Sequence, residues 1–509
     1  MFNAQSKDQL FLLIKSLTKA EKRNFKLYAN RIDSTGDTLF IRLFDVLDKM
    51  TDYDEEMVLK KISDLGKQSL FNAKRHLYKQ ILVSLRLIYI QKNIDIEIRE
   101  QIDFARILYE KGMYMQSLKL LDRIKKIAEE HHQDILHLEI LEFEKLIEAR
   151  HITRSRTVEN KMEKLLEASL TRSYITHASS YFSNFNIQIH GWYIEHGHIQ
   201  QESDIDGVRE YFESNLPKEL LHRSLTFFEK ANLFQAYMWY HYILLQFAEA
   251  QRYALEWLQL FEVYPQMKEK DSDLYMRSLY YVLSFLYINR DTEKYHFYLT
   301  QLSDFYASHQ PHLNEKSRMI AFVYLNLSRL NLLLLTEKYR ECQKLVQEIE
   351  LELRHFEVYT DVHRVLLFYY KFAYLFFAIG NYEKALHYLN EIVHLKTGHL
   401  RNDLLLNARL LQLLCHYELG NYDTIQYLIP STQRLLEKSG DNSRLPLLSL
   451  QLLSRLSKSA ASEHPAIFAQ FQSELKALCK NPYEQKAIFY LDVPKWAAGH
   501  VGVSKVVSH

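Results

Sequence analysis

Glycine and proline are scarce in this chain, which has 12 glycines and 8 prolines in 509 residues. Ordinary globular proteins contain about 7% glycine and about 5% proline, and the first proline here is Pro217. Hairpin-rich β proteins need turn residues about every 8–12 residues. A chain with so few turn residues cannot build those hairpins. The sequence therefore excludes most strand-and-turn architectures and predicts an all-α protein.

The chain also has almost no net charge: with 64 Lys and Arg residues and 63 Asp and Glu residues, its formal net charge is +1. No overall field attracts it to nucleic acid or to an anionic membrane. The cysteines Cys342, Cys415 and Cys479 are far apart and form no C-x-x-C motif, which indicates neither disulfides nor a cysteine zinc site. The most apolar stretch, 365–379, contains Lys371 and is too short for a membrane span. We expect a cytoplasmic protein with no membrane partner.

Enzyme signatures are missing as well. The sequence contains no G-x-x-x-x-G-K-[ST], no G-x-G-x-x-G after a strand, no H-E-x-x-H and no G-x-S-x-G. These motifs mark phosphate, dinucleotide, zinc and nucleophile sites. We therefore expect no catalytic residue, no cofactor and no enzymatic activity.

Two histidine-rich segments are the candidates for a metal site. HGWYIEHGH crowds together His190, Glu195, His196 and His198, and HHQDILH at 131–137 is a weaker candidate. Neither segment has the defined ligand spacing of a zinc site, and histidine is plentiful, with 23 in the chain. We interpret these residues as ordinary polar side chains and predict no metal. A metal-dependent hydrolase built on the first segment is the alternative.

One local pattern returns along the second half of the chain. Its tyrosines, at 253, 295, 339, 382 and 422, lie 42, 44, 43 and 40 residues apart, and a sixth copy surrounds Tyr114. A nearly fixed period of this length in a helical chain predicts stacked helical hairpins, because one hairpin is too small to bury its apolar face alone. We expect each tyrosine just after the turn, at the start of the second helix.

Two copies of the pattern share more than the tyrosine. A small residue lies on the first helix, a glycine at the turn, an aromatic two residues later and a small residue on the second helix. These residues are Ala105, Gly112, Tyr114 and Ser117 in one copy, and Ala373, Gly380, Tyr382 and Ala385 in the other. Small residues let paired helices approach closely, and glycine accepts a positive φ at a helix end. The pattern resembles the tetratricopeptide repeat (TPR).

The resemblance covers about 101–436 and is convincing from about 234 onward. The period of about 40–44 exceeds the 34 residues of a TPR, and Leu413 replaces the small residue before Gly420. The length also fits armadillo or HEAT repeats, so another α-solenoid is the alternative. The resemblance implies a TPR-like right-handed α-solenoid of stacked helical hairpins.

The chain divides into five expected regions. An N-terminal helical module with a basic helix spans 1–100, the first TPR-like hairpins 101–200, and the repeat array 201–438. Capping helices follow at 439–492, and a flexible tail at 493–509. Three glycines at 191, 197 and 207 and a proline at 217 predict an irregular connection around 197–217, where the repeat loses register.

The N-terminal module contains a basic segment. Between 60 and 92 it has eight basic residues against Asp64 alone. The candidate surface is Lys74, Arg75, Lys79 and Arg86, which could contact nucleic-acid phosphates or an acidic protein. We favour a third interpretation, a solvated helix face whose long side chains cover the neighbouring core.

The resemblance also implies a binding surface. In TPR proteins the first helices of successive repeats form a concave groove that holds a peptide or a partner helix. The positions that this implies are Tyr280, Tyr287, Tyr324, Asn331, Tyr370, Tyr374, Asn407 and Tyr417. Tyrosine and asparagine suit such a lining, although the same tyrosines could pack between helices instead.

These observations lead to one expected function and one alternative. We expect a non-catalytic protein–protein interaction scaffold whose partner is a protein or peptide. The alternative is a transcriptional or signalling regulator that contacts nucleic acid through the basic helices and senses a partner through the repeats. Its layout is similar to that of TPR-containing bacterial response regulators.

Overall fold

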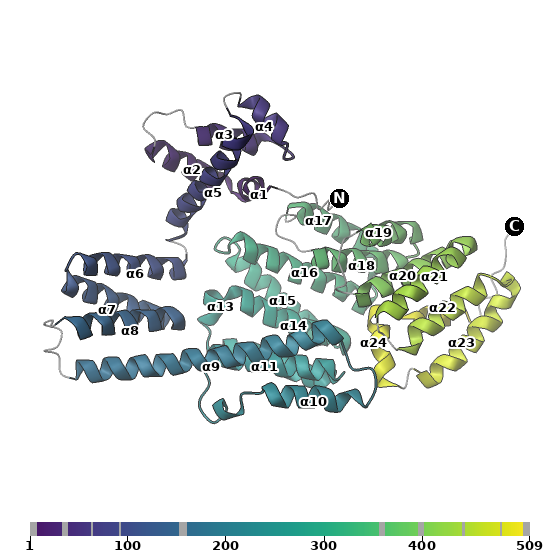
Figure 1. Ribbon diagram of the computed structural model, residues 1–509. Helices are drawn as coiled ribbons and strands as arrows, with labels where there is room; N and C mark the ends of the chain where they lie inside the picture. Colours follow the sequence, from purple (N-terminus) through teal and green to yellow (C-terminus); the bar gives the residue numbers. More distant parts are fainter. Residues whose placement is uncertain are drawn as a thin grey trace. The chain divides into compact units, whose positions relative to one another are not determined.

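A computed structural model describes residues 8–32, 39–62, 65–90, 93–151, 160–355, 362–394, 402–439, 443–478 and 481–501. Every regular element within these residues is a helix (Figure 1), so the predicted all-α class is confirmed. The chain forms two compact units, Met1–Ala178 and Ser179–His509. The boundary falls inside the long helix α9 (Lys161–His196).

Five helices form the first part of the N-terminal unit. They are α1 (Gln9–Ser16), α2 (Lys19–Ile32), α3 (Leu39–Lys49), α4 (Glu55–Lys61) and α5 (Lys67–Tyr89). Helix α2 begins with a capping box, because Thr18 Oγ1 accepts from the Glu21 N–H at 3.2 Å and Glu21 Oε2 accepts from the Thr18 N–H at 2.8 Å. The apolar faces of these helices enclose one core, which includes Phe44, Leu47 and Leu77.

Three further helices and the start of α9 complete this unit. They are α6 (Ile94–Glu110), α7 (Tyr114–Glu130) and α8 (Asp134–Arg150). Helices α6 and α7 pack as a hairpin, and the Ser117 hydroxyl donates to the Ala105 carbonyl oxygen at 2.8 Å. Both residues are fully buried, because only small side chains fit where two backbones come this close.

The C-terminal unit is a series of helical hairpins. Its helices after α9 are α10 (Asp204–Asn215), η2 (Lys218–Leu220), α11 (Phe227–Ile243), α12 (Phe247–Val263), α13 (Met267–Lys270), α14 (Ser272–Ile288), α15 (Thr292–His309), α16 (Glu315–Thr336), η3 (Tyr339–Glu341), α17 (Cys342–His355), α18 (Val362–Ala378), α19 (Tyr382–His394), α20 (Asn402–Glu418), α21 (Tyr422–Ser439), α22 (Arg444–Leu456), η4 (Ala461–Glu463), α23 (His464–Leu478), α24 (Pro482–Tyr490) and α25 (Val493–Ala498). Each hairpin from α11/α12 to α22/α23 packs against the first helix of the next hairpin.

Six turns between helices share one hydrogen-bond pattern. At the turn after α18, the Gly380 N–H donates to the Phe377 oxygen at 3.0 Å, and the Asn381 N–H donates to the Phe376 oxygen at 2.9 Å. This is a Schellman motif, which requires a left-handed residue. The left-handed residues of the six turns are Gly112, His132, Leu245, Arg290, Gly380 and Gly420, and the next helix begins two residues after each.

The positions of the turns show that the tyrosines do not all lie at the start of a helix, as the sequence predicted. Tyr114, Tyr382 and Tyr422 begin α7, α19 and α21 as predicted, but Tyr253 and Tyr295 lie inside α12 and α15. The sequence did not reveal this because non-glycine residues take the left-handed conformation in those two turns. Measured between the left-handed residues at 245, 290, 337, 380 and 420, the spacing is 45, 47, 43 and 40 residues.

Two expected region boundaries also differ from the structure. The connection predicted around 197–217 contains helix α10, and α9 is a single helix of 36 residues rather than part of a short hairpin. The predicted flexible tail is helical over Val493–Ala498, where Val493 and Ala497 are buried; residues 502–509 lie outside the described residues. Alternation of short hairpins therefore stops at α9, which accounts for the loss of repeat register.

One described helix, α16, is long and apolar enough to cross a membrane. However, 61% of its most apolar window is buried within the protein. Its neighbours α14, α15, α17 and α18 pack against it, so packing in the helical array accounts for its apolar composition.

Candidate functional site

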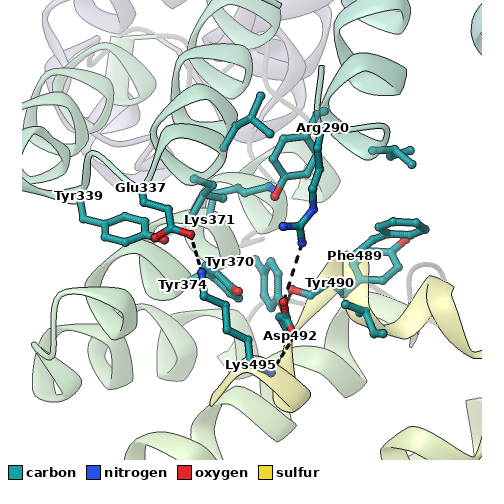
Figure 2. A pocket seen from close by; sticks show the side chains of 15 residues that line it. Arg290, Glu337, Tyr339, Tyr370, Lys371, Tyr374, Phe489, Tyr490, Asp492 and Lys495 are labelled. Carbon is teal, nitrogen blue, oxygen red and sulfur yellow. Dashed lines mark hydrogen bonds and ion pairs between the residues drawn. The ribbon is translucent and has the colours of Figure 1, made fainter. Parts of the chain in front are cut away.

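The eight predicted groove residues do not form one surface. Tyr287, Tyr370 and Tyr374 line a single cavity (Figure 2). Tyr280 and Tyr324 stack on each other with ring centroids 4.4 Å apart. The remaining residues are packed into the helical layers: Asn331, Asn407 and Tyr417 are all buried. The structure thus brings three of the eight together.

The surface beside this cavity is occupied by the chain's own C-terminal segment, residues 481–501. Tyr370 donates its hydroxyl to the carbonyl oxygen of Tyr490 at 2.7 Å, and Tyr490 donates its own hydroxyl to Asp403 Oδ2 at 2.9 Å. The ring of Phe489 meets Phe247 edge to face at 5.1 Å. The C-terminal segment therefore contacts α18, α20 and α12 at once.

A second set of contacts holds the end of the C-terminal segment. The indole N–H of Trp496 donates to Glu418 Oε1 at 2.7 Å, and His500 Nε2 lies 2.7 Å from the same oxygen. The rings of Trp496 and His500 pack against Phe468 and Tyr417. Tyr417, predicted to line an open groove, is therefore part of an aromatic cluster.

Sequence reasoning missed this segment, although a signal for it was present. Pro482 is the first residue of α24 and Pro494 the second of α25, positions at which proline favours a helix start. Asn481 and Asp492 act as N-caps: their side chains accept from the backbone N–H groups of Tyr483 and Lys495. The two cap–proline pairs predict two short helices.

The cavity between the repeats and the C-terminal segment has a volume of about 90 Å3. Its lining residues are Tyr287, Ile288, Arg290, Leu334, Leu335, Glu337, Tyr339, Tyr370, Lys371, Tyr374, Ile488, Phe489, Tyr490, Asp492 and Lys495. Lys495 Nζ lies 2.5 Å from Glu337 Oε1, and Arg290 lies 3.9 Å from Asp492 (Figure 2). Lys371 forms no ion pair with the described residues; its Nζ lies 4.7 Å from the ring centroid of Tyr287.

Burial shifts the pKa values of the side chains that line the cavity. Desolvation lowers the pKa of Lys371 to about 8, because burial disfavours its ammonium form. The same cause raises the pKa of Tyr287 to about 12 and raises the pKa values of Tyr370 and Tyr374 above their ordinary value. The tyrosines therefore stay neutral at pH 7 and can donate hydrogen bonds.

A second, larger groove of about 920 Å3 lies in the N-terminal unit between α7, α8 and α9. Its buried acid Glu144 is paired, because Lys125 Nζ lies 2.7 Å from it. Lys161, which also lines the groove, lies 2.8 Å from the buried Glu148. His137 faces the same groove, and burial lowers its pKa to about 4, helped by nearby cations. This histidine of the HHQDILH segment is thus neutral at pH 7.

The predicted basic surface on α5 separates into structural and exposed residues. Lys74 forms an ion pair with Asp8 and donates to the Tyr53 hydroxyl at 2.8 Å, so it stabilises the module. Arg86 lies 3.5 Å from Asp103. Arg75 and Lys79 are exposed and form no ion pair with the described residues. Of the four predicted residues, Arg75 and Lys79 are therefore the exposed ones without an ion pair to a described residue, whereas Arg86, also exposed, has Asp103 beside it.

The candidate metal ligands of HGWYIEHGH are dispersed among separate packing contacts. His190 stacks on Trp239 at 4.3 Å, and His196 stacks on Trp192 at 4.4 Å. His198 Nδ1 lies 2.8 Å from the Tyr242 carbonyl oxygen. Within the described part of the chain, no group of three or more His, Cys, Asp or Glu residues is placed to hold a metal ion.

Comparison with known proteins leaves the chain without an assigned family: no protein-family model matches it, and no curated protein sequence matches it.

Proposed function

We propose that the C-terminal unit is a TPR-like solenoid that acts as a non-catalytic scaffold and binds a peptide or helix of a protein partner. The observation that carries this proposal is the docking of the C-terminal segment on Tyr287, Tyr370 and Tyr374. A tyrosine hydroxyl that binds a backbone carbonyl, together with aromatic side-chain contacts, is how repeat surfaces and grooves hold peptides. The proposed role involves no catalysis, and the proposed location is the cytoplasm.

Several local features support the TPR-like assignment over another α-solenoid. Ala373 and Ala385 are fully buried in the α18/α19 hairpin, in the same relation as Ala105 and Ser117 in α6/α7. The turn glycine of each hairpin is left-handed. Close helix pairs with small residues at the crossing are the feature on which the resemblance rests.

The partner must exchange with the C-terminal segment, because this segment covers the three tyrosines. Its attachment has an aromatic part, at Phe489 and Trp496, and a polar part, at Tyr490 and Lys495. A partner that binds the exposed form of the groove shifts the population toward that form. Only a partner whose binding free energy exceeds the cost of displacing the segment would therefore bind.

Site-specific photo-crosslinking in the native cells tests the proposal. A photoreactive phenylalanine replaces Tyr374 in the wild-type chain and in a Trp496→Ala variant. This variant loosens the C-terminal segment and changes no side chain that lines the cavity. Tyr427, 82% exposed on α21, is the control position. We expect a crosslinked protein from position 374 that increases in Trp496→Ala and is missing from position 427. Crosslinks from 374 to residues 481–501 alone, in both backgrounds, would contradict the proposal.

A regulator that contacts nucleic acid is the second candidate function. It is favoured by one observation: Arg75 and Lys79 are exposed on α5, and this helix contains no acidic residue. Each phosphate contact steepens the fall of affinity with salt concentration. If the surface binds nucleic acid, Arg75→Gln/Lys79→Gln reduces both the affinity and this slope. No binding to duplex or single-stranded probes at low salt rejects this function, and an acidic protein partner would then remain for the surface.

A further inference from the structure

Lys371 is a half-buried lysine that faces a cavity, and its desolvated ammonium group has no acidic partner among the described residues. It lies in the middle of α18, which packs against α16, α19 and α20. The ring of Tyr287 lies beneath its ammonium group, and a cation–π contact offsets only part of the cost of removing a charge from water.

The titratable groups around the cavity show which charge is missing. By element they are Tyr287 and Arg290 on and after α14, Glu337 and Tyr339 after α16, Tyr370 and Tyr374 on α18, and Tyr490, Asp492 and Lys495 of the C-terminal segment. Glu337 pairs with Lys495, and Asp492 pairs with Arg290. Among the lining residues three cations therefore face two acids, and Lys371 is the cation that remains.

The space next to Lys371 matches a small monovalent anion. A cavity of about 90 Å3 has room for a few water molecules or for one carboxylate group, since a water molecule needs about 10–15 Å3 on this measure. A single unpaired ammonium balances one negative charge, which suits a carboxylate better than a phosphate dianion. The neutral tyrosine hydroxyls nearby can donate further hydrogen bonds to its oxygens.

We propose that this cavity is a carboxylate-binding site in which Lys371 pairs with the bound anion. The lowered pKa of Lys371 agrees with an ammonium group that lacks a counter-ion in the unliganded protein. The carboxylate comes either from a free small organic acid or from an acidic side chain of a docked protein. The site requires only the cavity as it stands, so it does not depend on the proposed scaffold function.

The first experiment measures acetate binding to the full-length protein by saturation-transfer NMR, with sodium chloride at equal ionic strength as the reference. We expect Lys371→Met to weaken acetate binding about tenfold or more, because a charged hydrogen-bond donor is lost. Raising the pH from 7 to 9.5 should weaken wild-type binding, since Lys371 then loses its proton. Lys371→Arg keeps its charge at both pH values and should still bind at pH 9.5.

A second arm distinguishes the two sources. A short capped alanine peptide with one central Glu is compared with its Gln counterpart and with acetate at the same concentration. Binding of the Glu peptide that exceeds that of acetate and depends on Lys371 indicates a protein side chain; binding of acetate alone indicates a free small acid. The proposal is overturned if neither probe distinguishes wild type from Lys371→Met, or if acetate binds equally at pH 7 and pH 9.5. Melting curves of each variant show that it is folded.

Discussion

Lys161 in the N-terminal unit and Lys371 in the C-terminal unit are both drawn into the protein, but their surroundings are opposite. Lys161 Nζ lies 2.8 Å from Glu148, which is fully buried, and 3.8 Å from Glu144. Lys371 lies over an aromatic ring, and no described carboxylate pairs with it. A paired buried lysine and an unpaired one thus occur in the same chain.

The difference separates a structural charge from a candidate binding charge. Each partner of a buried ion pair compensates the desolvation of the other, so removing one partner leaves an uncompensated charge. An unpaired buried ammonium destabilises the resting protein instead, and removing it relieves that cost. Substitutions at the two lysines should therefore change stability in opposite directions.

The largest expected effect is at Lys161. Lys161→Met removes the ammonium group that lies 2.8 Å from the buried Glu148 carboxylate, and we expect a loss of about 3 kcal/mol in the unfolding free energy of the N-terminal unit. Urea unfolding with hydrogen exchange of the α8 amides measures it. The control is Lys161→Met/Glu148→Met, which should recover most of the loss because both charges are gone. A loss as large in the double variant as in the single one would show that the pair is not the cause.

A gain of stability is expected at Lys371, and it should depend on pH. The pKa of this lysine is about 8 when folded, against an ordinary 10.5. Below pH 8 both states are protonated and the folded state bears the cost; from pH 8 to 10.5 only the unfolded chain keeps the proton, so wild-type stability rises with pH. Lys371→Met should gain at most about 3 kcal/mol at pH 7, the limit set by a pKa of about 8 against 10.5, and the gain should vanish above pH 10.5.

Thermal unfolding of both proteins across this pH range measures the gain at Lys371. The comparison with Lys371→Met removes the contribution of the tyrosines that titrate at high pH. A gain that is the same at pH 7 and at pH 10.5 would mean that side-chain packing, and not the charge, is responsible.

A smaller effect is expected where the C-terminal segment meets the repeats. Tyr370→Phe removes the hydroxyl that donates to the Tyr490 carbonyl oxygen, and the loss of this hydrogen bond should cost about 1 kcal/mol. Hydrogen exchange should then increase in residues 481–501 before it increases in α18. Tyr280→Phe is the matched control on α14, away from this contact. Equal exchange in the two variants would show that the Tyr370 hydroxyl does not hold the segment.

The smallest effect is expected for the exposed ion pair at the rim of the cavity. Lys495 and Glu337 are each 58% exposed, and exposed pairs contribute only about 0–1 kcal/mol. Lys495→Gln should therefore change the melting temperature by little, and less still at high salt. If the change exceeds that of Tyr370→Phe, this pair is the main attachment of the C-terminal segment.

The sequence predicted local structure well wherever one short pattern was sufficient. The scarcity of glycine and proline predicted helices, and Ala105 with Ser117 predicted a close helix pair. Each of these depends on neighbours in one helix or one hairpin. Where a left-handed turn residue was not glycine, as at Leu245, the pattern lost its visible marker.

The candidate site was predicted only in part, for a physical reason. The resemblance to the TPR implied that Tyr287, Tyr370 and Tyr374 share one surface with five other residues, but it did not reveal the segment that covers them. The contact between Tyr370 and Tyr490 joins residues 120 positions apart. No local spacing encodes such a contact, because it depends on the packing of helices that are far apart in the sequence.

By itself, the sequence determined that this protein is helical, where the hairpins with a turn glycine reverse direction, and which small residues allow close packing. Those properties follow from backbone preferences and from side-chain size over short distances. Only the tertiary structure decided that the C-terminal segment docks on the repeats. It also decided that the ammonium group of Lys371 is removed from water with no acidic partner among the described residues. Burial and charge pairing are set by residues distant along the chain, so the same lysine in the sequence could have been a solvated surface residue.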